Sequence, residues 1–384
     1  MSAVDSNQIS NLRILIMAGG TGGHVFPALA VAEELRSSGV KVFWLGTRRG
    51  LESDVVPKAG FAISYISING LRGKGVATLM LAPFKLMVAL IQSFYVLLSL
   101  KPDAVLGMGG FVTGPGGVVT RILRKPLVIH EQNAIAGLTN RLLAKIATQI
   151  LQAFPGAFDD SANLETVGNP VRTDIAKILP PEQRYQDREG ALRILVLGGS
   201  LGAVALNQTV PPALGMISEK LRPMVFHQTG RANKEETKKF YKYAGVDANI
   251  VRFIKNMSEA YEWADIVICR AGALTIAELA MAGVASILVP YPHAVDDHQT
   301  ANARSLTDAG AGLLIEQDKL TPRHLGDVLG SFVSEDMSDV RARLSNMAQA
   351  AKKLAKPDAT RDVARWCRKL ADPSFDNHIA EGPA

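Results

Sequence analysis

Two glycine-rich turns are the residues of this chain whose types and spacing point most directly to chemistry. Gly19-Gly20-Thr21-Gly22-Gly23 follows an apolar run at Arg13–Met17, and Gly198-Gly199-Ser200-Leu201-Gly202 follows a similar run at Arg193–Leu197. A turn of this kind between a strand and a helix presents backbone N–H groups and a helix N-terminus to an anion. Neither turn fits the dinucleotide pattern G-x-G-x-x-G, and the Gly-Lys-Ser/Thr of a P-loop is missing from both. The two openings predict two similar α/β domains that face a cleft, where the chemistry takes place.

Three further groups in the first half could bind or react. His24 follows the first turn at a predicted helix start, where an imidazole can act as a general base or form only local hydrogen bonds. A third glycine cluster at 107–117 could cradle a phosphate or pyrophosphate, or only form a tight turn. His130-Glu131-Gln132-Asn133 follows another apolar run, at a predicted helix start. Glu131 is a second candidate base and Asn133 a candidate ligand for a sugar, and the alternative for this group is a helix cap.

The second half carries a comparable group of small and polar residues. The segment 269–278 leads from a predicted strand into a helix that carries Glu278. Its carboxylate could accept two hydrogen bonds from a ribose diol, or only interact with the helix dipole. Paired Asp and His residues at 293–303 suggest metal ligands in isolation, but recognition of a sugar by Gln299 suits this segment better. We therefore expect neither a metal ion nor a cofactor.

Composition narrows the class of protein. The chain has 384 residues, 47% of them hydrophobic and 20% charged, and a net charge of +6. A charge this mild does not indicate nucleic acid, and it suits an anionic small ligand or an anionic membrane surface. The two cysteines, Cys269 and Cys367, form no zinc motif and no disulfide framework, which indicates a reducing compartment. The polar segment 1–11 lacks the apolar core of a signal peptide, so we expect a cytoplasmic protein.

Predicted strands and helices alternate through both halves, which favours two parallel sheets. The hinge is predicted near Pro170, and the first helix at 28–37. The predicted strands lie at 13–17, 41–45, 104–106 and 127–129 in the first half, and at 193–197, 224–227, 251–253, 266–268 and 286–289 in the second.

An apolar stretch at 76–100 is the one segment that suggests lipid. Its uncharged part, 86–100, would form a helix about 22 Å long, which is short of the ~30 Å needed to span a bilayer. Two interpretations stay open, a buried core helix and a helix with one face on lipid.

Six motifs together resemble the MurG family of glycosyltransferases, over about residues 12–368. They are GGTGGHVFPALA at 19–30, GGFVTGPGG at 109–117, HEQNAIAGLTNR at 130–141, GNPVR at 168–172, GGSLGA at 198–203 and CRAGALTIAEL at 269–279. The resemblance implies the α/β fold called GT-B, in which two Rossmann-like parallel-sheet domains face a cleft. It also implies an acceptor and membrane domain at 1–169 and a UDP-sugar domain at 170–357. A C-terminal helix at about 358–372 would pack back on the first domain.

The resemblance also assigns roles to individual residues. The backbone of Ile254 would read uracil, and Glu278 would bind the ribose. Arg172 would be a donor ligand. The diphosphate would be held by Ser200 and by the segment of Ala273, Leu274, Thr275, Ile276 and Ala277. The transferred sugar or the diphosphate would contact Thr21, Gly22, Gly23, Asn133 and Gln299.

The activity implied is inverting transfer of N-acetylglucosamine from UDP-GlcNAc to a lipid-linked MurNAc-pentapeptide, converting lipid I to lipid II in peptidoglycan synthesis. His24 or Glu131 would be the base, and we favour His24. The implied partners are both substrates, an anionic membrane surface that the basic residues Arg72, Lys74 and Lys85 would contact, and other cell-wall enzymes. The implied location is peripheral, on the cytoplasmic side of the cell membrane.

Three rival functions remain to be weighed. A nucleotide-sugar epimerase of the same fold would need no lipid acceptor. A non-catalytic UDP-sugar sensor or membrane scaffold would bind without turnover. A dinucleotide oxidoreductase is disfavoured because both glycine turns miss the fingerprint.

Overall fold

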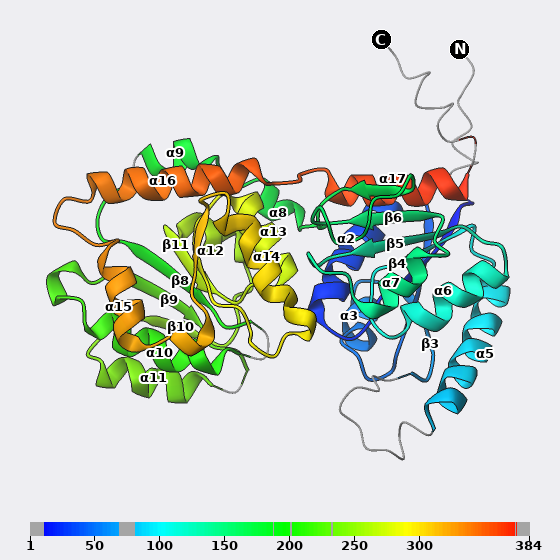
Figure 1. Ribbon diagram of the computed structural model, residues 1–384, viewed down its shortest axis with the longest axis horizontal. Helices are drawn as coiled ribbons and strands as arrows, with labels where there is room; N and C mark the ends of the chain where they lie inside the picture. The colour runs from blue at the N-terminus through cyan, green and yellow to red at the C-terminus, as the bar shows by residue number, and fades with distance from the viewer. Residues whose placement is uncertain are drawn as a thin grey trace, which may run out of the picture. The chain divides into compact units, whose positions relative to one another are not determined.

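The computed structural model describes residues 11–68, 81–186, 188–199, 202–231, 233–372 and 374. The chain divides into two compact units. Unit 1 contains Met1–Pro170 together with Asp358–Ala384, and unit 2 contains Val171–Pro357. Figure 1 shows the helices and strands of each unit.

Unit 1 is built on a seven-stranded parallel sheet with the strand order β3-β2-β1-β4-β5-β6-β7. The inner strand β1 is buried on both faces, from Ile14 to Met17, because helices cover both sides of a parallel sheet. The strands are β1 (Arg13–Met17), β2 (Lys41–Gly46), β3 (Ala62–Tyr65), β4 (Ala104–Gly107), β5 (Leu127–Glu131), β6 (Gln149–Gln152) and β7 (Leu164–Thr166). The helices are α2 (Gly22–Ser37), α3 (Glu52–Lys58), α5 (Ala82–Leu100), α6 (Thr113–Ile122), α7 (Leu138–Ala144) and α17 (Ala359–Ala371).

The C-terminal helix α17 belongs to unit 1 although it follows the whole of unit 2 in the chain. It is amphipathic, and Val363, Ala364 and Cys367 join the apolar core that contains β1 and α2. Trp366 donates a hydrogen bond from Nε1 to Glu165, at 2.8 Å. Figure 1 shows α17 in red beside α2.

Unit 2 repeats the architecture with a six-stranded parallel sheet of order β10-β9-β8-β11-β12-β13. The strands are β8 (Arg193–Leu197), β9 (Met224–Gln228), β10 (Asn249–Val251), β11 (Ile266–Cys269), β12 (Ala285–Leu288) and β13 (Gly312–Leu314). The α-helices are α8 (Thr173–Ala176), α9 (Pro181–Gln186), α10 (Val204–Gly215), α11 (Lys234–Tyr243), α12 (Met257–Trp263), α13 (Ala273–Ala282), α14 (His298–Thr307), α15 (Pro322–Gly330) and α16 (Ser338–Lys353). Short 3-10 helices lie at Glu219–Leu221, Val295–Asp297 and Gln317–Lys319.

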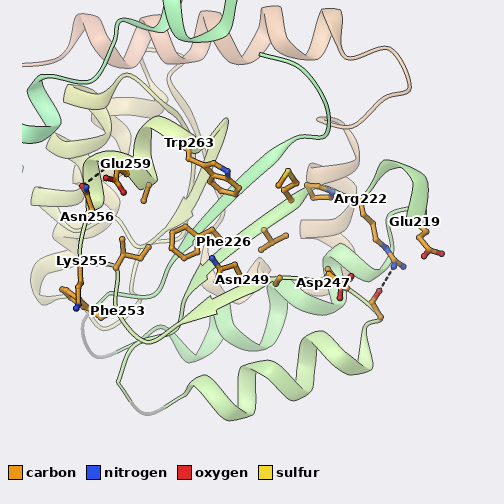
Figure 2. Close-up of a pocket in the computed structure, with 18 residues that line it drawn as sticks. Glu219, Arg222, Phe226, Asp247, Asn249, Phe253, Lys255, Asn256, Glu259 and Trp263 are labelled. Atoms are coloured by element: carbon orange, nitrogen blue, oxygen red, sulfur yellow. Dashed lines mark hydrogen bonds between the residues drawn. The ribbon is translucent and has the colours of Figure 1, made fainter. Parts of the chain in front are cut away.

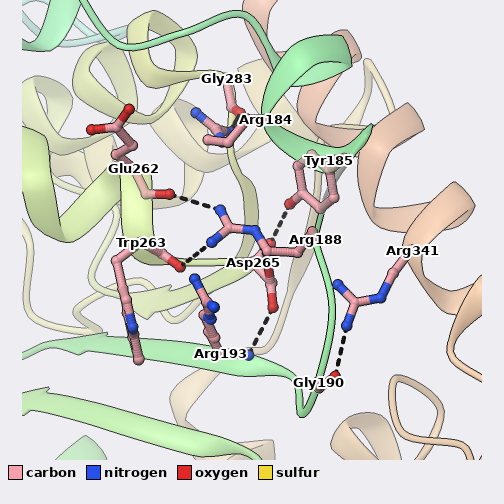
Figure 3. A network of polar contacts seen from close by, with 10 residues as sticks. All are labelled: Arg184, Tyr185, Arg188, Gly190, Arg193, Glu262, Trp263, Asp265, Gly283 and Arg341. Carbon is pink, nitrogen blue, oxygen red and sulfur yellow. Dashed lines mark hydrogen bonds and ion pairs between the residues drawn. The ribbon is translucent and has the colours of Figure 1, made fainter.

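A buried carboxylate, Asp265, fastens the start of unit 2 to its sheet (Figure 3). Asp265 accepts a hydrogen bond from the backbone N–H of Arg193 at 2.8 Å and lies 3.2 Å from Nε of Arg188. Arg188 also donates to the carbonyls of Glu262 and Trp263. Burial raises the pKa of Asp265, and the Arg188 charge opposes that rise. Because β8 and β11 begin here, this network lies at the amino ends of the strands, opposite the end of β8 that leads into the turn at Gly198, and its role is structural.

The predicted α/β fold with two parallel sheets is confirmed, while four local predictions are wrong. The first helix begins at Gly22 rather than at residue 28. The strand predicted at 251–253 ends at Val251, because only Asn249–Val251 pairs with β9. His130 and Glu131 end strand β5 rather than begin a helix, and the next helix starts at Leu138. The apolar helix begins at Ala82 and has 19 residues, so its length of about 28 Å does not by itself exclude a membrane span.

Candidate functional site

The first glycine turn connects β1 to α2 and holds His24 at the start of that helix. Thr21 is exposed at the N-cap position, and Gly22 and Gly23 are the first two helical residues. The first N–H groups of a helix have no partners within the helix, so this end of α2 can bind an anion. The Nδ1 atom of His24 lies 3.3 Å from the carbonyl oxygen of Gly19.

The glycines of this turn serve two different purposes. A Cβ on Gly19 would lie 2.7 Å from Oε1 of Glu52, and one on Gly22 would lie 2.8 Å from the ring of Phe26. These two glycines are therefore needed for packing. A Cβ on Gly20 would meet nothing within 4 Å, and Gly23 has similar space. The sequence predicts that a ligand can approach the whole turn closely. The structure leaves space for this at Gly20 and Gly23.

The third glycine cluster packs directly on the first turn. Gly109 and Gly110 both have positive φ, +98° and +86°, a conformation that glycine adopts without strain. A Cβ on Gly110 would lie 2.3 Å from the carbonyl oxygen of Gly19, and one on Gly109 would lie 2.7 Å from the ring of His24. The two glycine loops and His24 therefore form one continuous site at the carboxyl ends of β1 and β4.

Glu131, the second candidate base, is buried and fully engaged. Its carboxylate accepts hydrogen bonds from the backbone and side chain of Asn133 at 3.0 and 3.1 Å. It also accepts from the backbone of Gly137 at 3.1 Å and the side chain of Asn140 at 2.9 Å. Four donors occupy the acceptor positions of a carboxylate. Glu131 therefore orients Asn133, and this geometry favours His24 as the base.

His130, the neighbour of Glu131, is a structural residue. Its Nε2 donates to the carbonyl of Gly168 at 2.9 Å, and its Nδ1 accepts from Gln132 at 3.0 Å. Burial lowers the pKa of His130 to about 4, so the ring is neutral near pH 7. It connects the end of β5 to the segment that leads out of unit 1.

In unit 2, Glu278 lies in the middle of α13 with only 13% of its side chain exposed. Tyr261 donates a hydrogen bond to its Oε2 at 2.9 Å, and Nη2 of Arg172 lies 4.0 Å from its Oε1. Burial raises the pKa of Glu278, and the Arg172 charge and the Tyr261 hydrogen bond oppose that rise. Two predicted donor ligands, Arg172 and Glu278, are thus neighbours although 106 positions separate them in the sequence.

The remaining predicted residues of unit 2 lie on separate segments. Ala273, Leu274, Thr275, Ile276 and Ala277 form the first turns of α13 after the N-cap Gly272. Gln299 lies on α14 and accepts from the backbone N–H of Tyr291 at 2.9 Å. Ser200 lies outside the described residues.

A hollow of about 1150 Å³ in unit 2 includes Ile254 in its lining (Figure 2). Phe226 and Trp263 meet edge to face in it, with ring centroids 6.1 Å apart. Glu278, Gln299 and the first turns of α13 do not line it. Arg172, Glu278 and the first turns of α13 therefore lie outside the hollow that Ile254 lines.

The sequence did not indicate two residues that contact these sites, Glu52 and Tyr261. Glu52 accepts a hydrogen bond from Gly20, and Tyr261 donates one to Glu278. Glu52 is completely buried beneath the first glycine turn, and Tyr261 is completely buried beside Glu278. Each contacts a residue distant in sequence, so no local pattern indicates it. The glycines at 46 and 50 around Glu52 were the available signal, since neither has room for a side chain.

Helix α5 is the one helix among the described residues that is long and apolar enough to cross a membrane, judged by length and composition. One side, with Ala89, Ser93 and Leu97, packs on the core of unit 1. The opposite side is exposed and consists of Phe84, Leu86, Met87, Val88, Ile91, Phe94, Tyr95 and Leu98. Because one side of α5 packs on unit 1 and the other side is exposed, α5 is not a fully buried core helix. Lys85 is exposed on α5, and Arg72 and Lys74 lie outside the described residues.

Comparisons with known proteins cover both units. Residues 14–152 match the glycosyltransferase family 28 N-terminal domain, and residues 193–363 match the family 28 C-terminal domain. A protein of Marinobacter nauticus is 52% identical over 94% of this chain and 98% of its own length. A protein of Nitrosomonas europaea is 53% identical over 93% of this chain and 98% of its own length. Both carry the name UDP-N-acetylglucosamine–N-acetylmuramyl-(pentapeptide) pyrophosphoryl-undecaprenol N-acetylglucosamine transferase.

Solved structures give the same picture. The crystal structure of Acinetobacter baumannii MurG is 41% identical, covers 93% of this chain and 99% of its own, and superimposes with a TM-score of 0.81. A putative UDP-N-acetylglucosamine 2-epimerase from Listeria monocytogenes reaches a TM-score of 0.62 at 14% identity, covering 94% of this chain and 97% of its own. The second likeness reflects the shared fold alone.

Proposed function

This chain belongs to the MurG family within glycosyltransferase family 28, and from that premise we propose that it transfers N-acetylglucosamine from UDP-GlcNAc to lipid-linked MurNAc-pentapeptide. The reaction inverts the anomeric centre and converts lipid I to lipid II in peptidoglycan synthesis. This conclusion rests on about 50% sequence identity, along nearly the whole chain, with proteins named as N-acetylglucosamine transferases. The likeness to a putative epimerase at 14% identity reflects the shared fold and gives the rival epimerase no support.

We propose that unit 2 binds the donor. The backbone of Ile254 would read uracil, and the carboxylate of Glu278, held by Tyr261, would accept hydrogen bonds from the ribose hydroxyls. The first turns of α13 and the Ser200 loop would hold the diphosphate. Negative charge builds on the diphosphate as it leaves, and Arg172 with backbone N–H groups can stabilise that charge without a metal ion.

We propose that unit 1 binds the acceptor and supplies the base. His24 would take the proton of the acceptor hydroxyl as its oxygen attacks the anomeric carbon, while the bond to the UDP oxygen breaks on the opposite face. A single displacement of this kind gives inversion. Thr21, Gly22, Gly23 and Asn133 in unit 1, and Gln299 in unit 2, are the proposed contacts to the transferred sugar or the diphosphate.

An assay with UDP-GlcNAc and a short-chain, water-soluble analogue of the lipid acceptor tests this function. We expect one disaccharide product and one UDP per turnover, with a β-linkage in the product's NMR spectrum. UDP release or sugar epimerisation that proceeds without acceptor would favour the epimerase. Donor binding with no turnover in the presence of acceptor would favour a non-catalytic sensor.

We propose that the protein binds the cytoplasmic face of the cell membrane peripherally, through the exposed side of α5. Apolar side chains on one face of a helix insert into the interface between head groups and acyl chains. Lys85 on the same helix adds attraction to anionic lipid.

The variant with Leu86, Met87 and Ile91 replaced by Ser should bind anionic vesicles about 100-fold more weakly. Each exposed apolar side chain that enters lipid contributes on the order of 1 kcal/mol, and three such losses correspond to that factor. Leu90 is left unchanged because it packs against the core of unit 1. Vesicle sedimentation measures binding, and activity on the water-soluble acceptor should persist.

The matched control replaces Met216 and Tyr243 with Ser, since both are exposed apolar residues of unit 2. This variant should bind vesicles like the unmodified protein. A folded α5 variant with undiminished vesicle binding would contradict the proposed membrane face.

A further inference from the structure

The peptide group between Gly19 and Gly20 is hydrogen-bonded at both of its ends. Its carbonyl oxygen lies 3.3 Å from Nδ1 of His24. Its N–H, which belongs to Gly20, donates to Oε2 of Glu52 at 2.9 Å. Carboxylate, peptide and imidazole therefore form one continuous chain of hydrogen bonds within unit 1.

The direction of these hydrogen bonds fixes the form of the histidine ring. A carbonyl oxygen can only accept, so Nδ1 of His24 carries the proton in this contact. In the neutral ring the lone pair is then on Nε2, which is the atom that can take a proton. The contact with Gly19 thus selects the tautomer that a general base requires.

Glu52 is engaged only by donors. Besides Gly20, the backbone N–H and the hydroxyl of Thr47 donate to its Oε1, both at 2.8 Å. The side chain is fully buried. An ionised carboxylate accepts hydrogen bonds at both oxygens, so the three donors suit a negatively charged Glu52. This carboxylate lies beneath the glycine turn, and the reaction proposed above gives it no role.

Five glycines surround Glu52, the Gly19–Gly20 peptide and His24, and a side chain at any of the five would collide with these groups. A Cβ would lie 2.7 Å from Glu52 Oε1 at Gly19, 2.7 Å from Glu52 Cγ at Gly46 and 2.0 Å from Glu52 Oε2 at Gly50. On the other side, Gly109 and Gly110 pack on the His24 ring and on the Gly19 carbonyl. Much of the glycine content of these loops is thus explained by Glu52, the peptide and His24, rather than by a ligand.

We propose that Glu52 is a positioning residue that acts on His24 through the Gly19–Gly20 peptide. Its charge polarises the peptide, and hydrogen bonds in a chain strengthen one another. The Gly19 carbonyl therefore holds Nδ1–H more firmly and stabilises the imidazolium that forms when Nε2 takes the acceptor's proton. The arrangement corresponds to the Asp–His pair of a Ser-His-Asp triad, with a peptide group inserted between carboxylate and ring. This inference rests on the proposed role of His24.

The variant Glu52→Gln tests the proposal because it keeps the size of the side chain and removes its charge. Its single amide oxygen can accept from Gly20 or from Thr47, but not from both. Turnover should fall by about 10- to 100-fold, the range found when the hydrogen-bond partner of a metal-binding histidine is removed. Calorimetry with UDP should show unchanged affinity, because Ile254 and Glu278, the proposed ligands of the uracil and the ribose, lie in unit 2. The control Ser53→Ala loses one local hydrogen bond to Gly50 and should keep full turnover.

A double-mutant cycle with His24→Ala separates positioning from general damage. Glu52→Gln should lower turnover in the unmodified protein and cause no further loss when His24 is already Ala. A further loss in the His24→Ala background, or full turnover of Glu52→Gln alone, would overturn the proposal while leaving the proposed function intact. Full activity of His24→Ala itself would refute His24 as the base, and the relay with it.

A measurement on the unmodified protein keeps the proposal testable if Glu52→Gln does not fold. Nitrogen NMR of the histidine rings, with His24 assigned by comparison with His24→Ala, reports which ring nitrogen carries the proton. We expect the Nδ1–H form for neutral His24. The Nε2–H form would overturn the proposal.

Discussion

His24→Ala should lower turnover by about 10²- to 10⁴-fold, the usual contribution of a positioned general base, while donor affinity stays unchanged. The ring lies between the two glycine loops of unit 1, and its Nδ1 contact with Gly19 leaves the lone pair of the neutral ring on Nε2. Removal of the ring takes away the proton acceptor without altering α13 or Glu278. Steady-state kinetics with the water-soluble acceptor measure turnover, and calorimetry with UDP-GlcNAc measures donor affinity.

The matched control is His324→Ala, which removes an exposed histidine of α15 and should leave turnover unchanged. If His24→Ala retains turnover within a few-fold of the unmodified protein, His24 is structural and the base lies elsewhere. Glu131 would then be the next candidate, although four hydrogen-bond donors already occupy its carboxylate. The variant Glu131→Gln would test that candidate, and Asn133→Ala would show how much of its loss comes from the orientation of Asn133.

The fold was predictable because its signals are local. Strands β1 and β8 are continuous apolar runs, and both have the bounds that the sequence indicates, Arg13–Met17 and Arg193–Leu197. Strands β3, β6, β7 and β13 were missed for a physical reason, and β3 (Ala62–Tyr65) has only four residues. Gln149–Gln152 contains two glutamines, and Leu164–Thr166 and Gly312–Leu314 have only three residues each. Pairing with a neighbouring strand decides such segments, and apolar periodicity does not reveal pairing.

Only those site residues that belong to a local sequence pattern could be predicted. The glycine turns, His24 and Glu278 stand next to strands and helix starts, where sequence patterns are informative. Glu52 reaches Gly20 across 32 residues, and Tyr261 reaches Glu278 across 17. Contacts of that range depend on how β1, β2 and α3, or α12 and α13, pack together. A buried carboxylate between loops therefore becomes visible only in three dimensions.

Helix α5 shows how one misjudged boundary alters an argument. A helix limited to 86–100 is too short to span a bilayer, whereas the helix from Ala82 to Leu100 is close to the required length. Length therefore cannot decide between a span and a surface helix. Burial gives a second observation, because Ala89, Ser93 and Leu97 face the core while Phe84, Met87 and Ile91 face outward, and this supports the proposed surface helix.

Glu278→Ala should weaken the binding of UDP-GlcNAc by about 1.5–3 kcal/mol, because a charged hydrogen-bond acceptor is lost from the ribose. That loss corresponds to a dissociation constant about 10- to 150-fold larger. Calorimetry measures it directly. The control Glu236→Ala removes an exposed carboxylate of α11 in the same unit and should leave donor affinity unchanged. Tyr261→Phe should give a smaller loss, since it removes only the hydroxyl that donates to Glu278 at 2.9 Å.

The same carboxylate should make donor affinity depend on pH in a defined direction. Burial raises the pKa of Glu278 above its ordinary value of 4.5, and only the ionised form accepts both ribose hydrogen bonds. As pH falls toward the raised pKa, Glu278 takes up a proton and donor affinity declines. This decline begins at a higher pH than it would if the carboxylate were exposed and had an ordinary pKa. The diphosphate diester of UDP-GlcNAc stays ionised throughout this range, so the decline belongs to the protein. Glu278→Ala should lack it, and an identical pH dependence in both proteins, or an unchanged affinity at neutral pH, would remove Glu278 from the donor site.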